Sequence, residues 1–101
     1  MEKKMKVCRL IAELICKTTD EEPNTTAIAE TLAEIEHRAI KLRDKKLSAI
    51  VDEVNLRVRN KFFIRSGEYI TAELKAIKKI EQENENERRS NENTANKNTQ
   101  I

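Results

Sequence analysis

The residues with the clearest capacity for metal chemistry are Glu34 and His37, which are separated by two positions. On a helix this Glu-x-x-His spacing puts both side chains on one face, as in the half-sites of di-iron carboxylate bundles. A complete site needs a second such pair and further carboxylates, so it would require a dimer to which Glu30 or Glu13 contributes. Short motifs of this kind recur by chance in Glu-rich helices. We therefore interpret the pair as part of an acidic helix surface and predict neither a metal nor another cofactor.

Nucleophilic catalysis and phosphate transfer find little support in the sequence. His37 is the only histidine and Gly67 the only glycine, so the chain has neither a Gly-framed nucleophile nor a Gly-rich phosphate loop. A two-carboxylate acid–base site needs a cleft that shifts the pKa values of its carboxyl groups, and a small bundle has little concavity. We therefore predict a protein that is not an enzyme.

The two cysteines, Cys8 and Cys16, lie eight residues apart on one helical pattern. At about 1.5 Å of rise per residue their backbones are roughly 12 Å apart, which is too far for a disulfide. Neither has a second Cys or a His at metal-ligand spacing. We interpret both as reduced, partly buried, small apolar side chains, as in a cytoplasmic protein.

The elements that position these residues are predicted to be helices. A chain of 101 residues suits one small domain, and a single Gly and a single Pro are too few for a fold rich in tight turns. Because no apolar run is long enough to cross a bilayer and no signal peptide is apparent, we expect a cytoplasmic protein without a membrane span.

The segment around which the chain is organised runs from residue 24 to about residue 61. Apolar residues recur there at steps of four and three, which is the spacing of one helix stripe: Ile28, Leu32, Ile35, Ala39 and Leu42. After Leu42 the stripe turns, so either one helix changes its buried face or a break occurs within residues 43–46. Because no Gly or Pro interrupts, we predict a continuous helix. Residues 56–62 partly alternate like a strand, but no partner strand is evident and helix is preferred.

A shorter helix over residues 3–17 precedes this segment, Asn24 or Thr25 can cap the helix that opens it, and a third helix starting near Ser66 follows it. Glu81 and the residues after it carry few apolar side chains, so the helix should thin out near Arg88 and leave a disordered tail. The predicted fold is an all-α, small antiparallel bundle with a helical domain over residues 1–88 and a tail over residues 89–101. We assign the helix interface or core to Ile28, Leu32, Ile35, Leu42, Ile70, Leu74 and Ile77.

Charge is unevenly distributed although the net charge is only +2. Residues 20–36 contain six acids and no Lys or Arg, whereas residues 38–65 contain nine bases against three acids. This asymmetry favours head-to-tail or antiparallel self-association as readily as binding of an external polyanion. If a nucleic acid is bound, its candidate phosphate-binding residues are Arg38, Lys41, Lys45, Arg57, Arg59, Lys61 and Arg65.

Together these patterns predict a non-enzymatic interaction protein that presents helical, coiled-coil-like surfaces to another macromolecule as an adaptor, inhibitor or accessory factor. We expect it to be a homo-oligomer, a dimer or higher, because an eighty-residue bundle has a limited core. In size and charge the chain resembles many small accessory proteins of phages and mobile elements. The alternative is a DNA- or RNA-binding regulator that uses the basic surface of residues 38–65.

Overall fold

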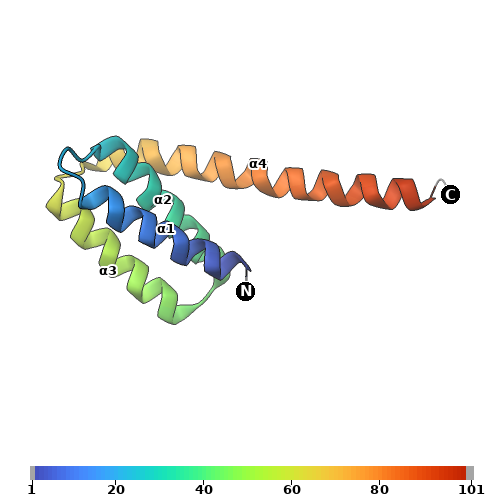
Figure 1. Ribbon diagram of the computed structural model, residues 1–101, viewed down its shortest axis with the longest axis horizontal. Helices are drawn as coiled ribbons and strands as arrows, with labels where there is room; N and C mark the ends of the chain where they lie inside the picture. Colours follow the sequence, from blue (N-terminus) through green and yellow to red (C-terminus); the bar gives the residue numbers. More distant parts are fainter. Residues whose placement is uncertain (1, 100–101) are drawn as a thin grey trace.

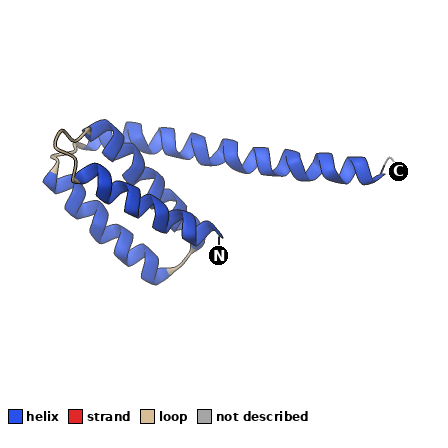
Figure 2. Cartoon of the chain, viewed as in Figure 1, coloured by secondary structure: helices blue, strands red, loops and turns tan. Residues whose placement is uncertain are grey.

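The computed structural model describes the backbone of residues 2–99 and the side chains of residues 2–88. Over this part of the chain the fold is all helical and contains no strand, which confirms the all-α part of the predicted fold but not its antiparallel arrangement (Figure 2). The four helices are α1 (Glu2–Thr18), α2 (Thr25–Leu42), α3 (Lys45–Lys61) and α4 (Ser66–Thr99) (Figure 1). No helix among the described residues is long and apolar enough to cross a membrane.

Helix α2 forms the centre of the molecule. All five of its residues from 31 to 35 are buried, because α1, α3 and α4 each pack against it (Figure 1). The predicted stripe is confirmed for Ile28, Leu32 and Ile35, which are fully buried, while Leu42 is partly buried. Their neighbours in the core come from α1 and α3 of the same chain: Val7, Leu14, Leu47 and Val51.

The start of α2 follows the predicted capping rule. Asn24 precedes the helix in an extended conformation, and its side-chain oxygen accepts a hydrogen bond from the backbone N–H of Ala27 at 3.1 Å. This bond satisfies one of the N–H groups that a helix start leaves without an intrahelical partner. The cap therefore fixes where the chain turns from α1 into the central helix.

The predicted continuous helix through residues 43–46 is wrong. Arg43 adopts a left-handed conformation (φ 54°) and ends α2, and Asp44 caps α3. The Asp44 carboxylate accepts hydrogen bonds from the N–H groups of Lys46 and Leu47, both at 3.1 Å. A residue other than glycine loses roughly 1–2 kcal/mol of stability when its backbone adopts the left-handed conformation. The cap and the packing of α3 back onto α2 offset that cost.

The helical interpretation of residues 56–61 is confirmed, since α3 continues to Lys61. The three apolar residues that follow α3 lie in different environments. Ile64 is buried and Phe62 packs on the core, whereas Phe63 has a positive φ of 52° and is 86% exposed.

The buried face of α4 differs from the predicted one. Ile70 and Leu74 are 55% and 64% exposed, and Ile77 is only partly buried. Of the two predicted alternatives, the core is therefore wrong for Ile70 and Leu74, and the helix interface stays a prediction. The residues that pack inward are Tyr69, Ala72, Ala76 and Ile80. The small side chains of the two alanines let the backbone of α4 approach α2 closely. The buried face of α4 is therefore rotated about the helix axis by about 100° from the stripe of Ile70, Leu74 and Ile77.

Beyond the bundle α4 extends away from the other helices (Figure 1). Residues 84–88 are exposed. The backbone is helical to Thr99. The side chains of residues 89–101 and the whole of residues 100–101 lie outside the described part, so the predicted disorder of that tail stays a prediction.

Candidate interaction surfaces

Ion pairs join α2 to α4 in a regular order. Lys75 contacts Glu30 at 3.0 Å, Lys79 contacts Glu34 at 3.0 Å, and Arg38 contacts Glu83 at 2.5 Å. Each pair is separated by 45 residues in the sequence, so the two helices run in the same direction. The charged edge of α2 therefore faces its own chain.

Arg38 and Glu34 form the inner part of this network. The Arg38 Nε atom donates to Glu34 at 2.9 Å, and the two side chains are only 13% and 8% exposed. Burial acts to raise the pKa of Glu34, but hydrogen bonds from Lys79 and Arg38 outweigh it, so that pKa is lowered. Both basic side chains are used to neutralise a buried carboxylate.

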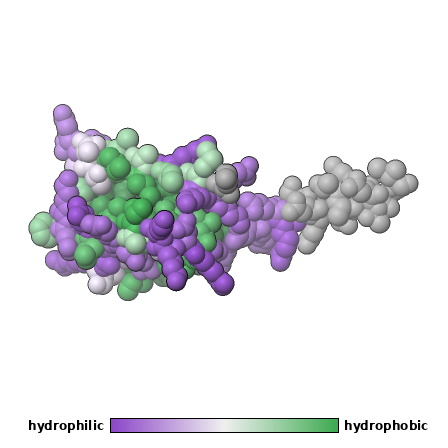
Figure 3. All heavy atoms as spheres, turned by 90° about the horizontal axis from the view of Figure 1, so that it is seen from below, coloured by the Kyte–Doolittle hydropathy of each residue, from purple (hydrophilic) through white to green (hydrophobic). Residues whose placement is uncertain are grey.

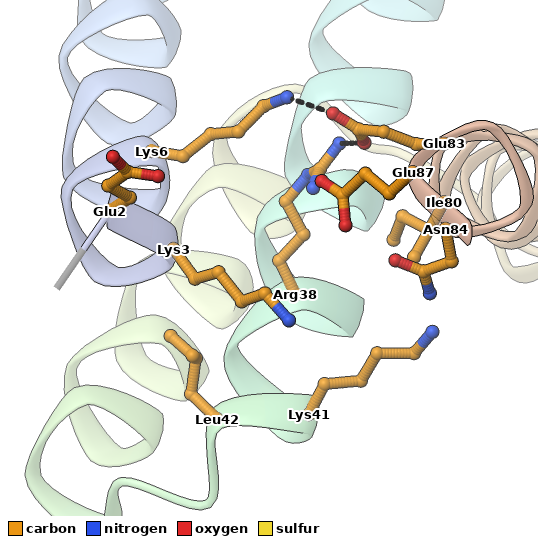
Figure 4. Close-up of a pocket in the computed structure, with 10 residues that line it drawn as sticks. All are labelled: Glu2, Lys3, Lys6, Arg38, Lys41, Leu42, Ile80, Glu83, Asn84 and Glu87. Carbon is orange, nitrogen blue, oxygen red and sulfur yellow. Dashed lines mark hydrogen bonds and ion pairs between the residues drawn. The ribbon is translucent and has the colours of Figure 1, made fainter. Parts of the chain in front are cut away.

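Glu83 connects the network to the first helix. It accepts a hydrogen bond from Lys6 of α1 at 2.5 Å and another from Arg38. These two bonds lower the pKa of Glu83 to about 2. The basic start of α1 thus meets an acid of α4, and three helices are joined at one carboxylate (Figure 4).

The metal half-motif is not assembled. The His37 Nε2 atom lies 2.9 Å from Glu73 of α4, whereas Glu34 turns to Arg38 and Lys79. Among the described residues no group of three or more His, Cys, Asp or Glu side chains could hold a metal ion. Both half-motif residues serve in contacts between α2 and α4.

A second polar cluster joins α2, α3 and the start of α4. The Tyr69 hydroxyl donates to Glu36, and the Asn55 amide donates to Glu36 at 2.9 Å and to the Tyr69 hydroxyl oxygen at 2.6 Å. Burial and the adjacent Glu36 carboxylate raise the pKa of Tyr69. The guanidinium of Arg59 lies over the Tyr69 ring, 4.4 Å from its centroid. The cluster positions the first turn of α4.

The predicted phosphate-binding residues do not form one row. Arg38 is enclosed in the Glu34–Glu83 network, and Arg59 is partly buried against Tyr69 with its Nε lacking a hydrogen-bond partner among the described residues. Arg38 is therefore already paired with two acids of its own chain. The remaining members are exposed and lie at the end of α2, along α3 and in the turn after it: Lys41, Lys45, Arg57, Lys61 and Arg65. Arg57 is paired with Glu53 at 2.7 Å, as its spacing suggests.

A pocket lies where α4 leaves the bundle, between α4, the start of α1 and the end of α2 (Figure 4). Its volume is about 650 Å³ and it opens to solvent. Four bases and three acids line it, and Lys6 and Arg38 are both neutralised by Glu83. The lining residues are Glu2, Lys3, Lys6, Arg38, Lys41, Leu42, Ile80, Glu83, Asn84 and Glu87. The bases outnumber the acids by only one, so most of the charge within the lining is balanced.

Aliphatic side chains remain on the outside of every helix. The large apolar residues that are more than half exposed are Met5, Ile15, Ile40, Ile50, Leu56, Phe63, Ile70 and Leu74. Figure 3 shows apolar side chains gathered on the face of the bundle that is seen from below Figure 1. Cys8 and Cys16 are both exposed, so their predicted partial burial is wrong. In the sequence, apolar residues cover a broader face of α1 than one neighbouring helix can bury, and this width indicates an exposed apolar surface.

Comparison of the chain with protein-family models, with curated proteins and with solved structures gives no match. The assignment of function therefore depends on the surfaces themselves.

Proposed function

We propose that the protein is a non-enzymatic interaction protein that binds another protein through the outer face of α4. The α4 surface consists of Ile70, Leu74 and Ile77, which follow one another at steps of four and three along the helix. The observation that carries the proposal is the exposure of Ile70 and Leu74 on a helix whose inward face is already filled. In this proposal α1, α2 and α3 form an antiparallel scaffold in a cytoplasmic protein.

The spacing of the α4 surface supports recognition of an apolar groove or helix on the partner. Single exposed aliphatic residues are ordinary on protein surfaces. A stripe that continues over two turns is the pattern by which an amphipathic helix enters a groove. Glu73, Lys78 and Glu81 lie beside it, and such polar rims surround apolar centres in protein interfaces.

Nucleic-acid binding is the competing hypothesis. Lys45, Lys61 and Arg65 are exposed and form no ion pair within the described part of the chain, which favours it. The internal use of Arg38 and Arg59 weakens it, since both belong to the basic set that such binding would need. Affinity for DNA or RNA that falls steeply with added salt would identify this alternative.

A photo-crosslinking amino acid placed at Leu74 in living cells tests the proposal. Asp52 is exposed on α3 and does not belong to the α4 surface or its rim, so the same amino acid placed there is the control. We expect a discrete protein adduct from position 74 that disappears when Ile70→Asp is added. Equal adducts from both positions, or adducts to nucleic acid alone, would contradict the proposal.

A further inference from the structure

The outer face of α1 carries an apolar stripe with the spacing of a coiled-coil seam. Met5, Cys8, Ala12 and Ile15 follow at steps of three, four and three, and all four are exposed, with Met5 at 54% and Ile15 at 56%. The core-facing residues of α1, such as Leu14, occupy the opposite side of the helix. A strict repeat of this kind is the pattern by which one helix packs along a single partner helix.

We propose that the α1 stripe, defined by Met5, Cys8, Ala12 and Ile15, binds the α1 stripe of a second copy of this chain in antiparallel orientation. The two-fold axis passes midway between the levels of Cys8 and Ala12. Met5 then packs against Ile15 of the second copy, and Cys8 packs against Ala12 of the second copy. Each large side chain meets a large one and each small side chain a small one, so the seam is self-complementary.

Charge supports this occupant and this direction. Arg9 flanks the stripe and makes no ion pair among the described residues, and antiparallel pairing brings it close to Glu13 of the second copy. The basic start of α1, with Lys3, also comes beside the acidic residues 20–22 that follow α1 in the second copy. Parallel pairing would instead oppose like charges along the whole seam.

The same charges disfavour a membrane surface as the occupant. An amphipathic helix bound to anionic lipid needs bases along its polar flanks. Four of the five bases of α1 lie in its first half, and Lys17 near its end is paired with Glu13 at 3.5 Å. Residues 20–22, which follow that end, are all acidic. A lipid surface would attract the first end and repel the second, whereas a second copy satisfies both.

The expected dimer is weak. The stripe is about 15 Å long, and an interface of that length falls below the roughly 1,200 Å² at which specific complexes become stable. Dimer should therefore accumulate between about 1 µM and about 1 mM protein.

Sedimentation equilibrium of the full chain tests the interface. Ala12→Glu should raise the dimer dissociation constant at least tenfold, because it puts a carboxylate into the seam. Ala49→Glu is the matched control, since Ala49 is an exposed alanine of α3 outside the stripe and should leave the constant unchanged. Both variants should keep their helix content. A chain that is monomeric at the highest concentration, or a dimer unaffected by Ala12→Glu, would overturn the proposal.

Cysteine cross-linking tests the direction of pairing. Every variant carries Cys16→Ser, so that Cys8 is its one native cysteine. Antiparallel pairing offsets the two Cys8 residues by about four residues along the helix axis, which is too far for a disulfide. Adding Ala12→Cys should give an intermolecular disulfide between Cys8 of one copy and the thiol introduced at position 12 of the other, and Cys8→Ser should abolish it. A disulfide between the two Cys8 residues without Ala12→Cys would overturn the antiparallel direction.

Vesicles of phosphatidylcholine and phosphatidylserine provide the last measurement. Binding of a monomeric chain to them would show a membrane surface as the occupant and would also overturn the proposal. The inference does not depend on the α4 surface, because Ala12→Glu should leave the cross-link from position 74 intact.

Discussion

Replacing Leu32 and Leu74 separately by alanine gives a direct test of which aliphatic residues hold the bundle together. Leu32 is fully buried at the centre of α2, whereas Leu74 is 64% exposed on α4. Truncating a buried leucine removes its transfer free energy and leaves a cavity, so Leu32→Ala should cost about 3 kcal/mol, within the usual range of about 2–5 kcal/mol. For a domain of this size that loss corresponds to a fall in Tm of roughly 12–24 °C.

Leu74→Ala removes the same atoms from an exposed position and should change the free energy of unfolding by less than about 0.5 kcal/mol. Urea denaturation followed by far-ultraviolet circular dichroism measures both variants against the wild-type chain. Equal losses for the two variants, or a larger loss for Leu74→Ala, would refute the rotation of the α4 face toward Tyr69 and the alanines. The comparison is matched, because both changes remove the same side-chain atoms from a helix.

Three further predictions concern the polar contacts and the extension of α4. The folded pKa of Glu83 lies below its unfolded value of about 4.3, so its stabilising contribution is present above that pH and is lost as the pH falls toward about 2. Acid titration of unfolding should show a shallower slope for Glu83→Gln. Tyr69→Phe leaves Glu36 and Asn55 without a shared hydroxyl and should lower the free energy of unfolding by about 1–3 kcal/mol, as measured in urea. A chain ending at Glu87 should keep the Tm of the full chain, because calorimetry reports the packed helices and Arg88, the first residue removed, is already exposed.

Much of the fold was predictable because it depends on local rules. The step-of-three-and-four spacing of Ile28, Leu32 and Ile35 requires one buried helix face, and Asn24 after Pro23 is a capping signal. The pairs Glu34–Arg38 and Glu53–Arg57 also formed as their one-turn spacing predicts. In each case the partners lie within one or two turns of the same helix.

The missed features depend on contacts between distant parts of the chain. The break after Leu42 uses Arg43 in a conformation that glycine normally supplies, although Asp44 three residues before Leu47 was a visible cap signal. The buried face of α4 depends on the close approach of Ala72 and Ala76 to α2. Hydrophobicity alone would favour burial of the larger aliphatic side chains.

The internal contacts of two candidate phosphate-binding residues, Arg38 and Arg59, were hidden for a related reason. In the sequence Arg38 has one acid at one-turn spacing, Glu34. Its other acidic partner, Glu83, is 45 residues away and gives no local signal. The same holds for Arg59, whose partner ring belongs to the next helix. Charge counted along the sequence thus overstated the basic surface that remains for a ligand.

Helix α4 is fixed at two points, by the Tyr69 cluster at its start and by Glu83 near the edge of the bundle. These points are about 21 Å apart along the helix, and the α4 surface lies between them. Rotation of α4 about its own axis is therefore blocked, and Ile70, Leu74 and Ile77 are held in one orientation before any partner arrives. Preorganisation of this kind lowers the entropy lost on binding, so a short aliphatic stripe can suffice where a flexible segment would need a larger contact.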